Sequence, residues 1–167
     1  MAKPLSRIDK DDLMRVVCDA IQHSITTTTA RARATAASAV NDEQRPENEY
    51  DTRGLEESYL AAGQAQRVAD LEVELASLRS LPIARFRPGA PIAATALVRV
   101  EDEDGEARVV FLLPAAGGVV VEMDGEKISI VSPQSPLGQA MVGRSEDDDF
   151  DFLIKGKTRS FTVIDVS

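Results

Sequence analysis

The fold of this chain is decided by one polar break, Asn41-Asp42-Glu43-Gln44-Arg45-Pro46-Glu47-Asn48-Glu49-Tyr50-Asp51. Five of its eleven residues are acidic and one is basic, and it lies between two long segments with a helical pattern. A polar, proline-containing break between two helices is typical of the tip of an antiparallel helical hairpin. We therefore expect residues 1–81 to form a helical hairpin whose acidic tip spans residues 41–51.

Both segments that flank the tip carry a narrow apolar stripe. The first runs from Arg7 to Val40 without an internal Pro or Gly, and the second runs from Asp51 to Leu81, where Pro82 closes it. Apolar or small residues recur in both at steps of three or four. They are Leu13, Val17, Ile21, Ile25, Thr28, Ala32, Ala36 and Val40, then Leu55, Tyr59, Ala62, Ala65, Val68, Leu71, Leu75 and Leu78. Because isolated helices would leave these stripes in water, we expect an antiparallel coiled coil.

The pattern changes after the second helix. Residues 82–91 contain three prolines and are predicted to be a linker, and residues 92–167 are predicted to be a second domain. Six short β-prone segments follow, joined by turns such as Asp124-Gly125, which is typical of a hairpin. They span residues 94–100, 108–113, 119–123, 127–131, 150–154 and 159–166.

One segment of the second domain, residues 135–143, has helix signals instead. Ser135 suits a cap, Pro136 suits the first helical position and Gly143 suits the end. The N-terminal helix has its own cap candidates, Ser6 and Asp9. The predicted fold class is α+β, with an N-terminal antiparallel helical hairpin followed by an antiparallel sheet domain with one short helix.

Charge and composition exclude several classes of protein. The net charge is −9, which argues against a sequence-independent grip on nucleic-acid phosphates and gives no basis for independent DNA binding. The single cysteine, Cys18, excludes an intramolecular disulfide and fits a reducing compartment. The longest apolar run, residues 109–121, is too short to span a bilayer. We expect a cytoplasmic protein with no membrane partner.

Catalytic motifs of common enzyme classes are missing. His23 is the only histidine, and the Gly117-Gly118 pair lacks the residues of a phosphate-binding loop. The acidic runs at residues 101–104 and 146–149 fit either solvated loops or weak sites for a hard cation. The tip carboxylates fit either a plain acidic turn or half of a Mg²⁺ site that a second protein completes.

Residues 131–143, Val-Ser-Pro-Gln-Ser-Pro-Leu-Gly-Gln-Ala-Met-Val-Gly, resemble a family signature. In the C-terminal domain of the bacterial Gre transcript cleavage factors, a strand ends in Ser-Pro-Leu-Gly and a short helix ends in Gly. The resemblance implies an FKBP-like domain that docks on RNA polymerase, and a coiled coil that enters the polymerase secondary channel as a monomer. The docking residues that it implies are Ser135, Pro136, Leu137, Gly138 and Gly143.

The family's tip carries an Asp, two further residues, then Glu-Asn. Here Glu47 and Asn48 match the Glu-Asn pair, whereas Gln44 stands at the position of the Asp. The resemblance implies that Mg²⁺ is held only in complex with the polymerase, with Glu47 as principal ligand and Glu43 or Asp42 as its partner. Three residues would support the tip, namely Asn48, Gln44 and Glu49. The polymerase itself would cleave at the 3′ end of the nascent RNA, so the chain is expected to be an activator and not an enzyme.

Two other functions stay open at this point. Gln44 motivates a secondary-channel binder that regulates transcription without stimulating cleavage, because an amide supplies no anionic ligand. The FKBP-like fold motivates a prolyl isomerase or chaperone, although such a pocket needs several aromatic walls. The linker and the second domain together offer Phe86, Phe111, Phe150, Phe152 and Phe161, most of them at alternating core positions.

Overall fold

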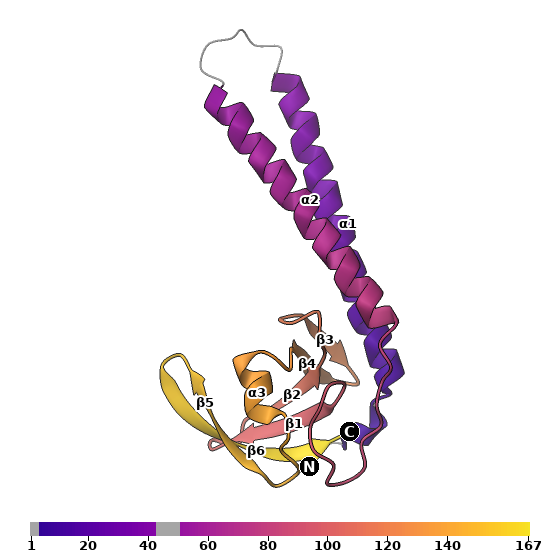
Figure 1. Cartoon of the computed structure of the whole chain (residues 1–167), viewed down its shortest axis with the longest axis vertical. Coiled ribbons are helices and arrows are strands. Elements are labelled where there is room, and N and C mark those ends of the chain that lie inside the picture. The colour runs from indigo at the N-terminus through magenta and orange to yellow at the C-terminus, as the bar shows by residue number, and fades with distance from the viewer. Residues whose placement is uncertain (1–3, 43–50) are drawn as a thin grey trace.

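The computed structural model describes residues 4–42 and 51–167, and it shows a long helical arm above a sheet domain (Figure 1). The described side chains are those of residues 4–38 and 55–167. The helices are η1 (Leu5–Arg7), α1 (Lys10–Asp42), α2 (Asp51–Arg79) and α3 (Pro136–Met141). The strands are β1 (Leu97–Asp102), β2 (Ala107–Leu112), β3 (Val120–Met123), β4 (Glu126–Val131), β5 (Asp149–Ile154) and β6 (Lys157–Val166). The predicted α+β class is confirmed, and each predicted strand is present with ends that differ by up to three residues.

The arm begins at a cap that the sequence predicts. Asp9 Oδ1 accepts hydrogen bonds from the backbone N–H groups of Asp11 and Asp12, at 2.8 and 3.1 Å. These N–H groups belong to the first turn of α1, which has no intrahelical acceptors for them. Ser6, the other candidate, lies in the 3-10 turn η1, so α1 starts at Lys10 and not near Arg7.

The predicted apolar seam is confirmed at the base of the arm. Its members there are all less than 9% exposed and belong to one cluster: Leu13, Val17, Ile21, Ile25, Leu71, Leu75 and Leu78. The same cluster continues into the sheet domain through Phe111, Ile128 and Ile130. The arm and one face of the sheet therefore share a single core.

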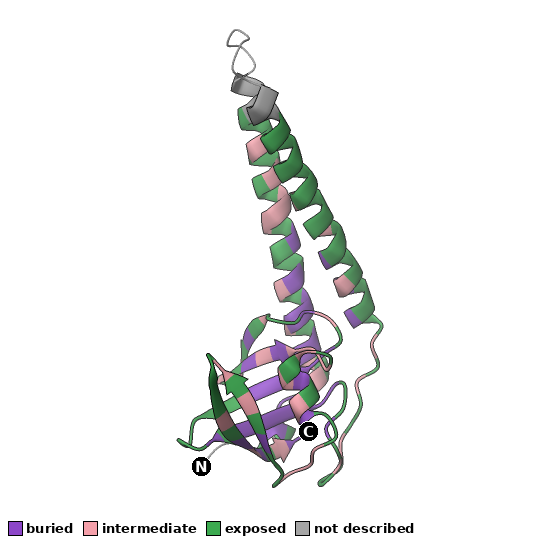
Figure 2. Cartoon of the chain, turned by 60° about the vertical axis from the view of Figure 1, so that its left-hand side comes forward, coloured by how far each residue is buried: buried purple, intermediate pink, exposed green. Residues whose placement is uncertain are grey.

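The seam prediction is wrong towards the tip. On α2, Leu55 is 54% exposed and Tyr59 is 74% exposed, and Ala62 and Ala65 are also exposed. Gln64 takes the half-buried place instead. Burial fades along the arm with distance from the sheet domain (Figure 2). The reason lies in α1, where Thr and Ala offer little apolar surface for the α2 side chains to cover.

The sheet has the strand order β3-β4-β2-β1-β6-β5 and is mixed. Every neighbouring pair is antiparallel except β2 and β4, which run parallel from Val109 opposite Ile128 to Leu112 opposite Val131. We expected an antiparallel sheet. The difference arises because the chain leaves β2, crosses to the sheet edge to form β3, and only then returns as β4 beside β2.

The two faces of the sheet are covered differently. The arm's base covers one face, and α3 covers the other, where Met141, Phe150 and Phe161 are buried. The rings of Phe150 and Phe161 stack with centroids 5.5 Å apart. In the part of the chain that the structure describes, no helix has the length and apolar character that crossing a membrane requires.

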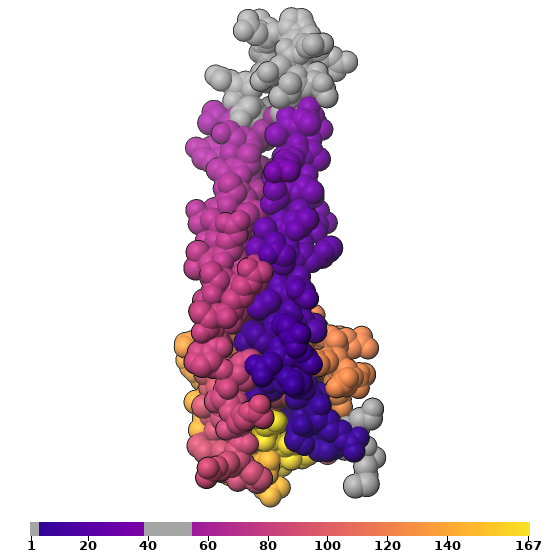
Figure 3. Space-filling view, turned by 90° about the vertical axis from the view of Figure 1, so that its right-hand side faces the viewer, coloured from indigo at the N-terminus to yellow at the C-terminus, as the bar shows by residue number. Residues whose placement is uncertain are grey.

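Hydrogen bonds tie the arm to the sheet domain at several points. The backbone N–H of Leu5 donates to Asp165 Oδ2 at 2.7 Å, and that of Ala116 donates to Glu74 Oε2 at 3.1 Å. Lys10 Nζ donates to the carbonyl oxygens of Ala84 and Thr95, at 2.5 and 3.2 Å. The space-filling view shows the two helices rising together from the domain as a narrow rod (Figure 3). The direction of the arm's base is thus fixed by packing and by polar contacts together.

Candidate functional site

The short helix α3 is built by the Ser-Pro-Leu-Gly motif. Ser135 Oγ accepts from the backbone N–H of Gly138 at 3.1 Å and donates to the carbonyl oxygen of Ser132 at 2.7 Å. Pro136 occupies the first helical position, where a missing N–H costs nothing. Gly143 follows the helix with φ of +85°, a conformation that favours glycine. The predicted cap, first residue and end of this helix are confirmed.

Gly138 is required by close packing. A Cβ at this position would lie 2.1 Å from the carbonyl oxygen of Ser132 and 2.8 Å from the Cα of Pro133. Both neighbours are backbone atoms, so neither can move aside cheaply. Ser135 and Gly138 thus shape the backbone, while Pro136 is exposed and Leu137 is half-buried.

An apolar groove of about 400 Å³ lies beside the start of α3. Its walls come from the segment before β3, from β4 and its end, from α3 and from β5. The lining residues are Gly117, Gly118, Val119, Val120, Ser129, Ile130, Val131, Ser132, Ser135, Pro136, Leu137 and Phe152. Val120 is 47% exposed, so the groove offers apolar surface directly to solvent. Such a surface suits an apolar side chain of a protein partner.

The acidic run at residues 146–149 organises its own loop. Asp148 Oδ2 accepts from the N–H of Ser145 at 2.7 Å, and Glu146 Oε1 accepts from the N–H of Val166 at 3.2 Å. Asp149 Oδ1 accepts from the hydroxyl of Thr162 at 2.6 Å. Among the described residues, no group of three or more His, Cys, Asp or Glu side chains is placed to hold a metal ion. These contacts favour the structural interpretation of the run.

The other acidic run contains a buried carboxylate. The side chain of Asp102 is fully buried and accepts from the N–H groups of Glu106 and Asp104, at 2.9 and 3.1 Å. It also pairs with Arg159 Nη1 at 2.8 Å. The N–H of Glu106 is the largest cause that holds the pKa of Asp102 below its ordinary value, and the N–H of Asp104 and the Arg159 guanidinium add to it. The Asp-x-x-Gly turn pattern could have signalled this role from the sequence.

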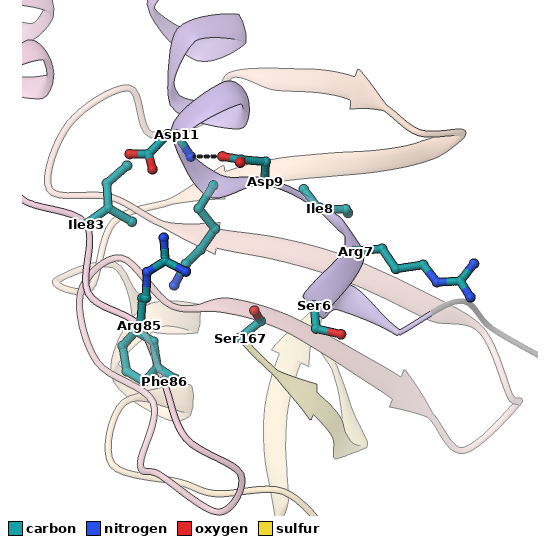
Figure 4. Close-up of a pocket in the computed structure, with 10 residues that line it drawn as sticks. Ser6, Arg7, Ile8, Asp9, Asp11, Ile83, Arg85, Phe86 and Ser167 are labelled. Carbon is teal, nitrogen blue, oxygen red and sulfur yellow. Dashed lines mark hydrogen bonds between the residues drawn. The ribbon is translucent and has the colours of Figure 1, made fainter.

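The charged side chain of Lys10 lies at the junction between the arm and the sheet domain, a position that the sequence alone does not predict. A cavity of about 370 Å³ lies between the start of α1 and the linker, and Lys10 lines it. Figure 4 shows Arg85 and Phe86 reaching into this region from the linker, opposite Ser6 and Ser167. Lys10 Nζ lies 4.8 Å from the centroid of the Phe86 ring. Burial, and then the charge of Arg85, lower the pKa of Lys10 to about 8.

Most of the predicted tip site falls outside the described residues. Glu43, Gln44, Glu47, Asn48 and Glu49 belong to residues 43–50, which the structure does not describe. Asp42 is the last residue of α1, and its side chain is also not described. The helix ends that flank this break lie at the far end of the arm from the sheet domain (Figure 1).

The aromatic residues speak against an isomerase pocket. Phe111, Phe150 and Phe161 are each no more than 3% exposed and belong to the two core clusters. Phe86 and Phe152 are half-buried and line separate cavities. The five Phe side chains therefore do not line one shared pocket of the kind that a prolyl isomerase needs.

Several solved structures and curated proteins named as transcription factors are similar to this chain. Thermus aquaticus Gfh1 is 20% identical and has a TM-score of 0.41, with 91% of this chain and 94% of that chain covered. The prokaryotic transcription elongation factor GreA/GreB from Nitrosomonas europaea is 19% identical with a TM-score of 0.38, and 58% and 78% of the two chains are covered. Transcription elongation factor GreA of Methylococcus capsulatus is 23% identical over 142 residues, which are 83% of this chain and 84% of the relative. GreA of Psychromonas ingrahamii is 23% identical over 100 residues, 60% of each chain.

The most direct match covers the sheet domain. Residues 90–167 match the family model described as "Transcription elongation factor, GreA/GreB, C-term". This range contains all six strands, the α3 motif and the apolar groove. Residues 90–167 of this chain therefore form a GreA/GreB C-terminal domain.

Proposed function

We propose that this protein binds bacterial RNA polymerase, inserts its arm into the secondary channel, and stimulates cleavage of backtracked RNA by the polymerase active site. The observation that carries the proposal is the position of the helix ends that flank the acidic break, at the far end of an arm whose base is fixed to a GreA/GreB C-terminal domain. A 33-residue helix such as α1 spans about 50 Å, so docking of the domain delivers the tip to a distant site.

The donor set of the tip fits a hard cation. Glu47, with Glu43 or Asp42, would offer carboxylate oxygens, which Mg²⁺ prefers. The ion supplies charge neutralisation at the phosphate and a more acidic bound water. This chain's part is to hold the carboxylates in the channel, with Asn48, Gln44 and Glu49 supporting them, while the polymerase performs the cleavage at the RNA 3′ end. No metal is held by the free protein in this proposal.

Docking is assigned to the apolar groove beside α3. Pro136 and Leu137 are the motif residues that a partner can reach, and Val120 extends the same surface. Ser135, Gly138 and Gly143 contribute by fixing the backbone of α3 and not by direct contact. This division separates binding residues from residues that only shape the site.

A transcript cleavage assay on stalled elongation complexes tests the proposal. Glu47→Ala is expected to lose most of the stimulated cleavage while binding to polymerase persists. Glu56→Ala is the matched control, because Glu56 is an exposed acid on α2 outside the break. Unchanged cleavage with Glu47→Ala would remove Glu47 from the proposed site.

The same assay decides the alternative that Gln44 motivates. If the unmodified protein binds polymerase but shortens no RNA at any Mg²⁺ concentration, it is a secondary-channel regulator without cleavage activity. Gln44→Asp supplies the anionic ligand that the family pattern has at this position. In the cleavage proposal, this variant is expected to be at least as active as the unmodified protein.

A further inference from the structure

The α2 helix carries an unsatisfied polar atom in the middle of the arm's seam. Gln64 Oε1 is buried, and no hydrogen-bond partner for it is found among the described residues. Gln64 continues the inward row of Val68 and Leu71, so its amide stands where an apolar side chain would seal the two helices. A buried acceptor without a partner favours any conformation that exposes it to water. Gly63, next to it, faces open space, with no atom within 4 Å of its Cβ position, and glycine weakens the interior of a helix.

The α1 helix also has a region of competing side-chain hydrogen bonds. Ser24 and Thr26 donate to the carbonyl oxygens of Ala20 and Gln22, at 3.2 and 3.0 Å. Thr35 and Ser38 donate in the same way to Arg31 and Ala34. Such bonds to the carbonyl four residues back compete with the helix ladder and often bend it. The first Ser or Thr of α1 is Ser24, so this competition affects only the part of the helix from there on.

Apolar packing stops where these polar features start. Ile25 and Leu71 are the last fully buried seam residues, at 7% and 5% exposure. Beyond them, Leu55 and Leu60 are each 54% exposed. Figure 2 shows buried residues only on the lower half of the arm. The orphan acceptor of α2, the side-chain bonds of α1 and the end of apolar packing therefore all lie at or beyond the end of the buried base.

We propose that the arm has a polar joint, formed by residues 24–29 of α1 and by Gly63 and Gln64 of α2. The base below the joint is rigid because it shares the core of the sheet domain. The part above it opens and closes about the joint. Since Asp51 to Gly63 is about 20 Å of helix, a small rotation at the joint displaces the tip by several ångströms.

Amide hydrogen exchange on the free, full-length protein tests the joint without polymerase. Amides of residues 30–38 and 55–62 are expected to exchange at least about tenfold faster than those of residues 13–23 and 68–78, with a step at the joint and not a gradual rise. Gln64→Leu removes the orphan acceptor and adds seam contact, so it is expected to slow exchange above the joint by about tenfold. Exchange in the base should not change.

Gln66→Leu is the matched control. It makes the same chemical change two residues along, at an exposed position. Equal effects of the two substitutions would overturn the proposal, because any gain in helix propensity would then be the cause. Equal protection of both halves in the unmodified protein would overturn it as well.

A distance measurement gives a second, independent reading. Spin labels at Ala34→Cys and Ser58→Cys, both exposed positions, report the separation of α1 and α2 above the joint in a Cys18→Ala background. A broad distance distribution that narrows with Gln64→Leu supports the joint. A narrow distribution that Gln64→Leu leaves unchanged contradicts it.

Discussion

Gly138 packs so closely against Ser132 that a Cβ on residue 138 would lie 2.1 Å from the Ser132 carbonyl oxygen. The contact joins α3 to the end of β4 and thereby forms one wall of the apolar groove. Two of the four residues in the Ser-Pro-Leu-Gly motif, Ser135 and Gly138, thus serve backbone packing, although the family resemblance assigns the motif to docking.

Gly138→Ala is expected to destabilise the protein by about 1–3 kcal/mol, the usual cost of forcing a methyl group into a packed core. Urea unfolding followed by circular dichroism measures the change. Gly117→Ala is the control, since its Cβ would meet nothing closer than 3.9 Å. A Gly138→Ala variant as stable as Gly117→Ala would contradict the packing argument.

Acid should weaken the fold partly through Asp102. Because the pKa of Asp102 is lowered from 3.8 in the folded state, the unfolded chain binds more protons on acidification. The stabilisation is therefore complete above about pH 4–5 and is lost as the pH falls through the folded pKa. Asp102→Asn should be less stable at neutral pH and should show a flatter dependence on acid. Glu103→Gln, at an exposed position in the same turn, should keep the steep dependence.

Lys10 should make the stability of the protein depend on pH in the alkaline range. Here burial disfavours the charged form, whereas at Asp102 hydrogen bonds favour it. Its folded pKa of about 8 lies below the ordinary 10.5, so the unfolded chain binds more protons between these values. The free energy of unfolding is expected to gain a positive contribution from Lys10 as the pH rises from about 8 to 10.5. Lys10→Met should remove that slope, although it also removes the hydrogen bonds to Ala84 and Thr95. Lys127→Met, at an exposed site, should leave the slope unchanged.

The groove should be the surface that polymerase binds. Val120→Asp places a charge on its apolar wall and is expected to weaken binding to polymerase by about tenfold or more. Because Val120 is 47% exposed, folding should be retained, and circular dichroism checks this. Val73→Asp is the control, since Val73 is a 70% exposed valine on α2. Equal binding by both variants would move the docking surface elsewhere.

The features that could be predicted from the sequence are those that neighbouring residues determine. Ser135, Pro136 and Gly143 marked the bounds of α3 because caps and turns depend on a few neighbouring residues. The helical period identified the seam of the base for the same reason. The resemblance of residues 131–143 to the Gre signature agrees with the GreA/GreB match over residues 90–167.

Long-range relationships could not be predicted in this way. The parallel pairing of β2 with β4 depends on β3 taking the sheet edge, and no local pattern records that path. The inward turn of Gln64 depends on how little apolar surface α1 offers opposite it. Lys10 gains its partners from Ala84 and Thr95, more than 70 positions away. Each of these features is set by packing between distant segments.

The shared core of arm and sheet also governs how the chain folds. Leu13, Leu75 and Phe111 lie in one apolar cluster, although they come from both sides of the predicted linker. Cutting the chain within residues 82–91 would expose that cluster on both fragments. The base of the arm and the sheet domain should therefore unfold in a single cooperative transition.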